Sequence, residues 1–154
     1  MSTDVRVEVT VRRPRSDVAA FMFEPSNDTV WTSGVVDVRP LMDGRLRVGS
    51  KVERTSRFLG RTFAYEYEVV EADGDRMVAM HVEQPFPMQI RYELADAPGG
   101  HTVAVIHAKG EAGGFYRLAA PLLNSMVRRS IAKDLAALKA HLEQLTSASE
   151  PSTR

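Results

Sequence analysis

The chain has 154 residues, which is the length of a single domain with enough apolar material to form a core. Its 20 basic and 20 acidic residues cancel, and this balance argues against nucleic acid or an anionic membrane as a partner. The absence of cysteine excludes disulfides and thiolate chemistry and removes the commonest structural zinc ligands. Because no apolar run is long enough to span a bilayer and no secretion signal is present, we expect a cytoplasmic protein without membrane insertion.

The first predicted elements are a strand and two short helices. Residues 5–11 alternate valine with polar residues, which is the pattern of a half-buried strand. Pro14 begins a stretch typical of a helix start, and residues 18–22 give that helix an apolar side. Pro25 ends it, and residues 27–32 predict a second short helix or a turn.

Six segments of strand character follow, separated by short turns rich in glycine, proline and aspartate. We predict strands at residues 35–41, 51–59, 61–71, 76–83, 88–95 and 102–109. Gly60 joins two of them in a tight hairpin. Because the connections are short, neighbouring strands should be antiparallel.

The longest predicted element is a helix over residues 113–145, in which apolar residues recur in steps of three and four. We expect its buried face to include Leu122, Met126, Ile131, Leu135 and Leu138. Its solvated side is marked by Arg128, Arg129, Lys133, Asp134, Lys139 and Glu143. Pro121 predicts a kink near Leu118. Residues 146–154 are predicted to be a disordered tail after a single domain of residues 1–145.

The order of these elements predicts an α+β fold in which a curved seven-stranded antiparallel sheet wraps around the long C-terminal helix, with two short helices between strands 1 and 2. Three stretches, together with the Gly60 hairpin, carry a resemblance to a known family. They are RPRSDVAAFMFEPSNDTVWTSGVVDVRPL, EQPFPMQIRYEL and KGEAGGFYRLAAPLLNSMVRRSIAKDLAALKAHL. Over nearly its whole length the chain resembles the START-like helix-grip superfamily (SRPBCC), in its polyketide cyclase/dehydrase and lipid transport branch. The resemblance is specific for the fold, because the superfamily uses one scaffold for many functions.

Alternation along the strands predicts which side chains face the interior of such a fold. The polar ones are Arg54, Ser56, Tyr65, Tyr67 and Tyr92. The apolar ones are Val52, Phe58, Phe63, Val69, Met88, Ile90, Leu94, Ala104, Ile106 and Ala108. Residues 76–83 are apolar on both faces, so alternation leaves open whether the set of Val78, Met80 and Val82 or the set of Met77, Ala79, His81 and Glu83 faces inward. By spacing from the Pro85-Phe86-Pro87 corner, the resemblance favours the set that contains His81.

These polar residues have both structural and functional interpretations. A buried arginine needs a partner, so Arg54 pairs with a glutamate, reaches solvent at an edge, or contacts a ligand oxygen. The tyrosines are either amphipathic core residues or a row of hydroxyls inside an apolar pocket. His81 is either a satisfied core histidine or a site residue. Trp31, which the resemblance places beside the cavity mouth, is either a packing residue or a ligand gate.

The resemblance implies a cavity between the sheet and the long helix, and we expect it to bind a small hydrophobic ligand that is lipid-like or aromatic polyketide-like. The expected ligand-binding residues are Trp31, Arg54, Phe58, Phe63, Tyr65, Tyr67, His81, Tyr92, Phe115, Leu118, Leu122 and Met126. One alternative is an enzyme of the polyketide cyclase, aromatase or dehydratase type, with Arg54, Tyr65 and His81 as catalytic candidates. Another alternative is a protein-interaction module whose cavity is plugged by its own side chains.

No sequence motif indicates a metal or a cofactor. The four histidines lack ligand spacing, no glycine-rich phosphate loop follows a strand, and no serine stands in a nucleophile-elbow pattern. We therefore expect no metal and no cofactor. The expected partner is a small hydrophobic molecule, and the protein is expected to be a monomer or a homodimer.

Overall fold

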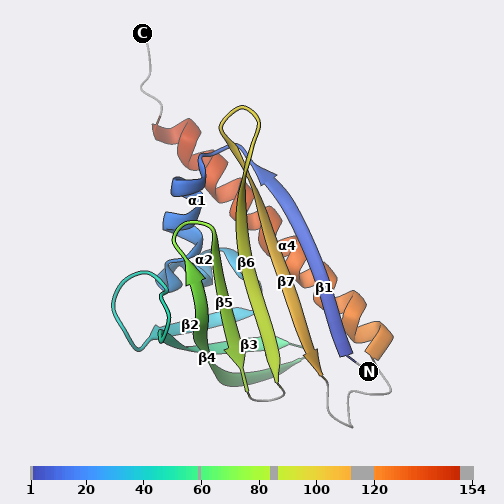
Figure 1. The fold of residues 1–154 in the computed structure, drawn as a ribbon. Helices are drawn as coiled ribbons and strands as arrows, with labels where there is room; N and C mark the ends of the chain where they lie inside the picture. Colours follow the sequence, from blue (N-terminus) through green and yellow to red (C-terminus); the bar gives the residue numbers. More distant parts are fainter. Residues whose placement is uncertain (1, 59, 84–86, 112–119, 150–154) are drawn as a thin grey trace.

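The computed structural model describes residues 2–58, 60–83, 87–111 and 120–149, and its architecture is the predicted one (Figure 1). The strands are β1 (Ser2–Val11), β2 (Val35–Pro40), β3 (Lys51–Phe58), β4 (Arg61–Asp73), β5 (Met77–Val82), β6 (Met88–Ala97) and β7 (His101–Glu111). The helices are α1 (Arg15–Met22), the short 3-10 helix η1 (Pro25–Asn27), α2 (Asp28–Trp31) and α4 (Ala120–Ser149). The strands pair antiparallel in the order β1-β7-β6-β5-β4-β3-β2, which confirms the seven-stranded sheet.

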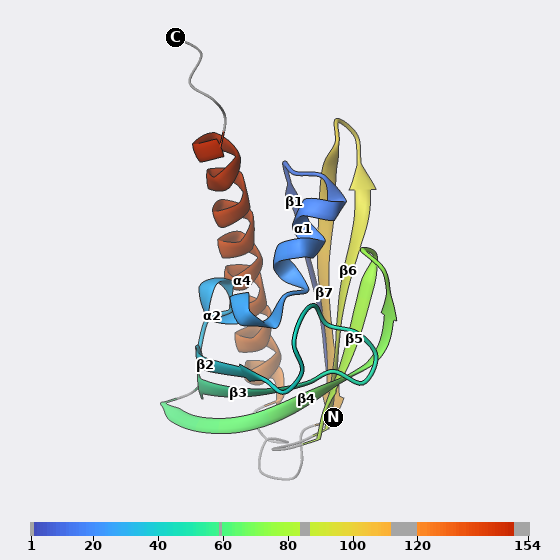
Figure 2. The same cartoon turned by 90° about the vertical axis from the view of Figure 1, so that its left-hand side faces the viewer.

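The sheet is strongly bent, so that the strands of its two halves run in different directions. Figure 2 shows β2, β3 and β4 running crosswise to β6 and β7, with α1, α2 and α4 on the concave side. Two irregularities in register lie in the crosswise half, between Val35 and Asp37 of β2 and between Val69 and Glu71 of β4. Irregularities of this kind bend a strand and increase its twist. They help the sheet to curve around the long helix.

Helix α4 covers the sheet at the edge formed by β1. Arg128 Nη1 donates to the backbone oxygen of Arg6 at 3.2 Å, and Lys139 Nζ donates to that of Thr10 at 2.8 Å. An edge strand presents unpaired backbone groups, which these two side chains partly satisfy. The contacts hold the helix along β1 and leave its apolar side turned toward the concave face.

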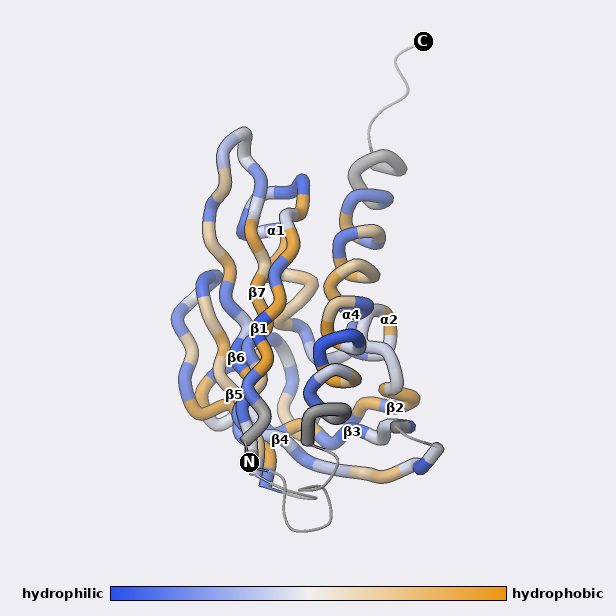
Figure 3. The backbone as a smooth tube through the Cα atoms, turned by 90° about the vertical axis from the view of Figure 1, so that its right-hand side faces the viewer, coloured by the Kyte–Doolittle hydropathy of each residue, from blue (hydrophilic) through white to orange (hydrophobic). Residues whose placement is uncertain are grey.

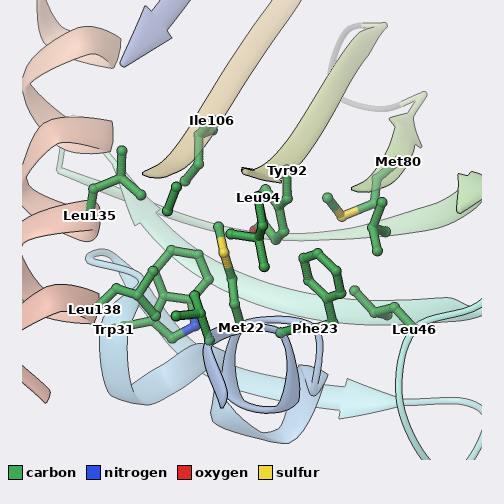
Figure 4. Packing of buried hydrophobic residues seen from close by; sticks show 14 of the residues in the cluster. Met22, Phe23, Trp31, Leu46, Met80, Tyr92, Leu94, Ile106, Leu135 and Leu138 are labelled. Atoms are coloured by element: carbon green, nitrogen blue, oxygen red, sulfur yellow. The ribbon is translucent and has the colours of Figure 1, made fainter. Parts of the chain in front are cut away.

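The apolar core lies between α4, the short helices and the concave face of the sheet (Figure 4). Hydrophobic and hydrophilic residues alternate along the strands, as the tube in Figure 3 shows for β1. The predicted burial of Leu135 and Leu138 is confirmed. Met126 and Ile131 are only half-buried, and the side chain of Leu122 lies outside the described residues.

The long helix continues to Ser149, so the predicted disordered tail is wrong for residues 146–149. The prediction rested on the small and polar composition of that segment. No proline or glycine stands between Pro121 and Pro151, however, and composition alone does not end a helix. Pro121 is in the first turn of the described helix. The kink expected near Leu118 lies outside the described residues.

Candidate functional site

Arg54 of β3 points to the concave side, as predicted, and only 5% of its side chain is exposed. Its Nε and Nη2 donate to Oδ2 of Asp28 at 3.0 and 2.8 Å. Asp28 is the first residue of α2, and its side chain is 1% exposed. Of the partners considered for Arg54, the structure therefore shows a carboxylate, but one from a short helix and not a glutamate of the sheet.

Three tyrosines surround this buried ion pair. Arg54 Nη1 donates to the Tyr65 hydroxyl at 3.3 Å, and Nη2 donates to the Tyr92 hydroxyl at 3.4 Å. The Tyr67 hydroxyl donates to Asp28 Oδ2 at 3.4 Å. The guanidinium carbon of Arg54 lies 4.7 Å from the centroid of the Tyr67 ring, a cation–π contact. We call these five residues the Arg54 cluster; they come from α2, β3, β4 and β6.

The strand registers bring the four sheet residues of the Arg54 cluster together. Arg54 stands directly opposite Tyr65 in the β3–β4 ladder, and Tyr67 lies two residues further along on the same face. Tyr92 stands opposite the buried Val78 of β5. The inward orientation of these four residues was predicted from alternation alone, and the structure confirms it.

Asp28 was missed because α2 is too short to show a periodicity. The sequence feature that could have revealed Asp28 is its spacing from Trp31, since residues three apart lie on the same side of a helix. Trp31 was expected beside the interior, so Asp28 should have been expected there as well. The chain enters α2 through a capped turn, in which the Glu24 carboxylate accepts from the Ser26 N–H at 3.1 Å.

Burial and the contacts with Arg54 together set the protonation states in the Arg54 cluster. It raises the pKa of Asp28, and this shift is opposed by the Arg54 charge and by hydrogen bonds from Arg54 and Tyr67. Burial also raises the pKa of Tyr92 to about 12 and that of Tyr67 well above its usual value. At neutral pH both phenols therefore keep their protons. The Arg54–Asp28 pair is a guanidinium compensated by a carboxylate.

The Arg54 cluster contains more hydrogen-bond donors than acceptors. An arginine has five N–H groups, and the contacts above use four of those of Arg54. The Tyr65 and Tyr92 hydroxyls accept from Arg54, and neither donates to an acceptor among the described residues. The buried Nε1 of Trp31, whose ring lies edge-on to Tyr92 at 5.7 Å, also lacks a partner there. Because buried donors normally have partners, the cluster is suited to the acceptor atoms of a bound molecule.

A second buried carboxylate lies on α4. Asp134 is 6% exposed and accepts from the Ser33 N–H at 2.6 Å, while the hydroxyl oxygens of Ser33 and Ser130 are 3.3 Å apart. The prediction that Asp134 marks the solvated side is wrong. The residue follows Ile131 by three and precedes Leu138 by four, so it lies on the apolar stripe. Burial raises the pKa of Asp134, although the hydrogen bond from Ser33 opposes the shift.

The predicted inward face of β5 is wrong, and with it the role assigned to His81. The outer set is Met77, Ala79, His81 and Glu83, and the buried set is Val78, Met80 and Val82. His81 is 36% exposed, and its Nε2 lies 2.7 Å from Glu83 Oε2. The register explains the error, because Val82 stands opposite the inward-facing Tyr67. His81 therefore lies on the outer face of the sheet and is not a candidate for catalysis or ligand binding.

The other predicted site residues are divided between packing positions and positions that are not described. Trp31 is buried and packs against Tyr92 and Leu138, which fits the packing role, one of the two alternatives considered for it (Figure 4). Phe63 is half-buried, with its ring centroid 5.9 Å from that of Tyr65. Met126 is half-buried on α4. Phe115, Leu118 and the side chains of Phe58 and Leu122 lie outside the described residues.

Within the described ranges, no group of histidine, aspartate or glutamate side chains is arranged to hold a metal ion. In the same part of the chain, no helix is both long enough and apolar enough to cross a bilayer.

An open antiparallel sheet curved around a long C-terminal helix, with short helices between the first two strands, defines a helix-grip protein. This chain belongs to the family described as polyketide cyclase / dehydrase and lipid transport, which matches residues 2–143. No curated protein matches the chain in sequence.

Solved structures share the fold at low sequence identity. The Zhui aromatase/cyclase from Streptomyces sp. R1128 is 18% identical with a TM-score of 0.81, over 99% of this chain and 100% of that one. The protein TTHA0849 from Thermus thermophilus is 15% identical with a TM-score of 0.79, over 96% and 99% of the two chains. The di-domain ARO/CYC BexL from the BE-7585A biosynthetic pathway is 17% identical with a TM-score of 0.75, over 96% of this chain and 48% of that one. At these identities the likeness concerns the fold.

Proposed function

We propose that this protein binds a small hydrophobic molecule between the sheet and α4, and that the Arg54 cluster orients it through an acceptor oxygen. The observation that carries the proposal is the surplus of hydrogen-bond donors in and beside the cluster, of which all but that of Tyr65 are buried, within a mostly apolar interior. Apolar contact would supply affinity, and the few polar groups would determine orientation. A lipid-like or aromatic polyketide-like molecule with carbonyl or hydroxyl oxygens has this character. The family description, which includes both polyketide chemistry and lipid transport, supports such a ligand.

Differences in burial support a ligand position toward the start of α4. Tyr65, Met88, Ile90 and Ile131 pack against the core but remain partly exposed. On the side of α1, Met22 and Phe23 are fully buried (Figure 4), although Phe21 remains partly exposed. A molecule placed next to Tyr65 and the early turns of α4 would cover the half-buried set.

The test is saturable binding of Nile red, a neutral hydrophobic fluorophore with a carbonyl oxygen. We expect a dissociation constant in the micromolar range or below. Met126→Trp should fill the proposed position and abolish binding, with little change in melting temperature. His81→Trp adds the same ring on the outer face and should bind like the wild type. The binding proposal fails if the folded wild type shows no saturable binding.

A second candidate function, cyclisation or dehydration of a polyketide-like substrate, is favoured by the second buried carboxylate. Burial raises the pKa of Asp134, and a carboxylate with a raised pKa is a stronger base. The donors of Arg54 and Tyr65 would polarise a substrate carbonyl. Zhui and BexL bear aromatase/cyclase and ARO/CYC names, which supports testing this chemistry.

The enzymatic test uses a linear poly-β-ketone thioester, with loss of water on ring closure followed by mass spectrometry. Tyr65→Phe and Asp134→Asn should each lower turnover by at least about tenfold, which is at the low end for loss of an acid–base or electrostatic group. If turnover is absent in the wild type or unchanged in both variants, the enzymatic candidate is rejected, and the binding role stands by itself.

A further inference from the structure

The interior contains an unequal number of positive and negative groups. Among the described residues, the buried side chains that carry a charge at neutral pH are Arg54, Asp28 and Asp134. One cation therefore shares the interior with two carboxylates. A ligand that enters this space loses its hydration, so its own charge must find compensation inside.

The charge of Arg54 is already compensated. Two of its nitrogen atoms donate to the same carboxylate oxygen of Asp28, at 2.8 and 3.0 Å. Hydrogen bonding to a carboxylate at these distances is the strong, charge-assisted kind. Arg54 makes no hydrogen bond to Asp134, which instead accepts from the Ser33 backbone. Asp28 is thus the group that neutralises the guanidinium.

The donors that remain around this pair suit a neutral acceptor. The unused N–H of Arg54 and the hydroxyl hydrogens of Tyr65 and Tyr92 can each be accepted by a carbonyl, ether or hydroxyl oxygen. A carboxylate would accept the same hydrogens, but it would add a third negative charge to an interior with a single cation. Its electrostatic cost would not be offset.

From these contacts we infer that Asp28 is a specificity-determining residue, which makes the site select neutral oxygenated ligands and reject carboxylates of the same shape. The inference rests on the proposed binding function and narrows its ligand class. It separates ketones, esters and phenols from free fatty acids and other carboxylic acids. Arg54 then acts as a donor of directional hydrogen bonds and not as an anion receptor.

The test compares ligands that differ only in charge. Acetylnaphthalene and naphthoate share one ring system, and a long-chain methyl ketone and the fatty-acid anion of equal length share one chain. Each is titrated at neutral pH against the wild type, Asp28→Asn and the matched control Asp37→Asn, which makes the same change at an exposed position. Competition with Nile red reports all affinities on one scale.

We expect the wild type and Asp37→Asn to bind each ketone at least about tenfold more tightly than its carboxylate partner. Asp28→Asn should shift this ratio toward the carboxylate by on the order of a hundredfold, as removal of a charge about 5 Å away at an effective dielectric constant of about 20 implies.

Equal or tighter binding of the carboxylates by the wild type would overturn the inference, even if Asp28→Asn does not fold. An unchanged ratio in folded Asp28→Asn would overturn the role of this residue. If neither member of a pair binds, the proposed function fails and the inference fails with it.

Discussion

Replacement of Arg54 by methionine keeps most of the apolar volume of the side chain and leaves the Asp28 carboxylate without a counter-charge. Both groups are nearly inaccessible to water, at 5% and 1% exposure, so water cannot replace the lost partner. Breaking a buried pair on one side costs about 3–5 kcal/mol, and we expect this range for Arg54→Met and for Asp28→Asn. In the double variant neither charge remains. Its cost should be smaller than the sum of the single costs by at least about 2 kcal/mol.

Urea denaturation of the four proteins at pH 7 gives this double-mutant cycle directly.

A second experiment measures how the cost of Arg54→Met depends on pH. In Arg54→Met the burial that raises the pKa of Asp28 acts without opposition from the guanidinium. A carboxyl group whose pKa is higher in the folded than in the unfolded state binds a proton on folding, so folding is favoured by acid. The cost of Arg54→Met should therefore shrink as the pH falls from about 7 to about 5. Additive single effects, or single costs below about 1 kcal/mol, would refute the reasoning.

Two further predictions concern α4. Leu135→Ala should lower the free energy of unfolding, measured in urea, by about 2–5 kcal/mol. Lys133→Ala, at an exposed position, should change it by no more than about 0.5 kcal/mol. Similar values for the two variants would show that the buried face of α4 has been assigned incorrectly. Desolvation opposes the charge of Glu143, but hydrogen bonds from Lys139 and Arg12 lower its pKa to about 2. Its contribution to stability is therefore present above the unfolded pKa and is lost as the pH falls toward 2. Glu143→Gln should be less stable than the wild type at pH 7 and equally stable near pH 2, and a difference that does not change with pH would contradict this assignment.

The strand pattern was enough to predict the sheet and most of its inner face. On β3, β4 and β6 the large apolar and aromatic residues fall mostly in one of the two alternating sets, so the direction of residues such as Tyr67 and Tyr92 follows from burial alone. On β5 both sets are apolar, and the choice placed His81 inside. The pairing of Val82 with Tyr67 decides the question, and that register is a relation between two strands which neither strand shows by itself.

Besides the shortness of α2, which hid Asp28, a second physical reason applies both to Asp28 and to Asp134, the two carboxylates that sequence reasoning did not place inside. A polar residue is assigned to the surface because its burial without a partner is costly. Here the partners come from far along the chain: Arg54 is 26 residues from Asp28, and Ser33 is 101 residues from Asp134. Such partners appear only when the chain has folded.

Buried charges break the local rules that otherwise hold along this chain, and such exceptions concentrate where a function or a strained arrangement requires them. Substitution of each of the two carboxylates can therefore distinguish a role in folding from a role in function. A carboxylate that serves only the fold should change the free energy of unfolding and leave ligand selectivity intact when it is replaced by asparagine. One that serves the site should change the ratio between neutral and charged ligands in the variant that still folds. We expect Asp28, which is hydrogen-bonded to Arg54, to meet the second condition, whereas Asp134 is held by a backbone donor and must show its role by turnover.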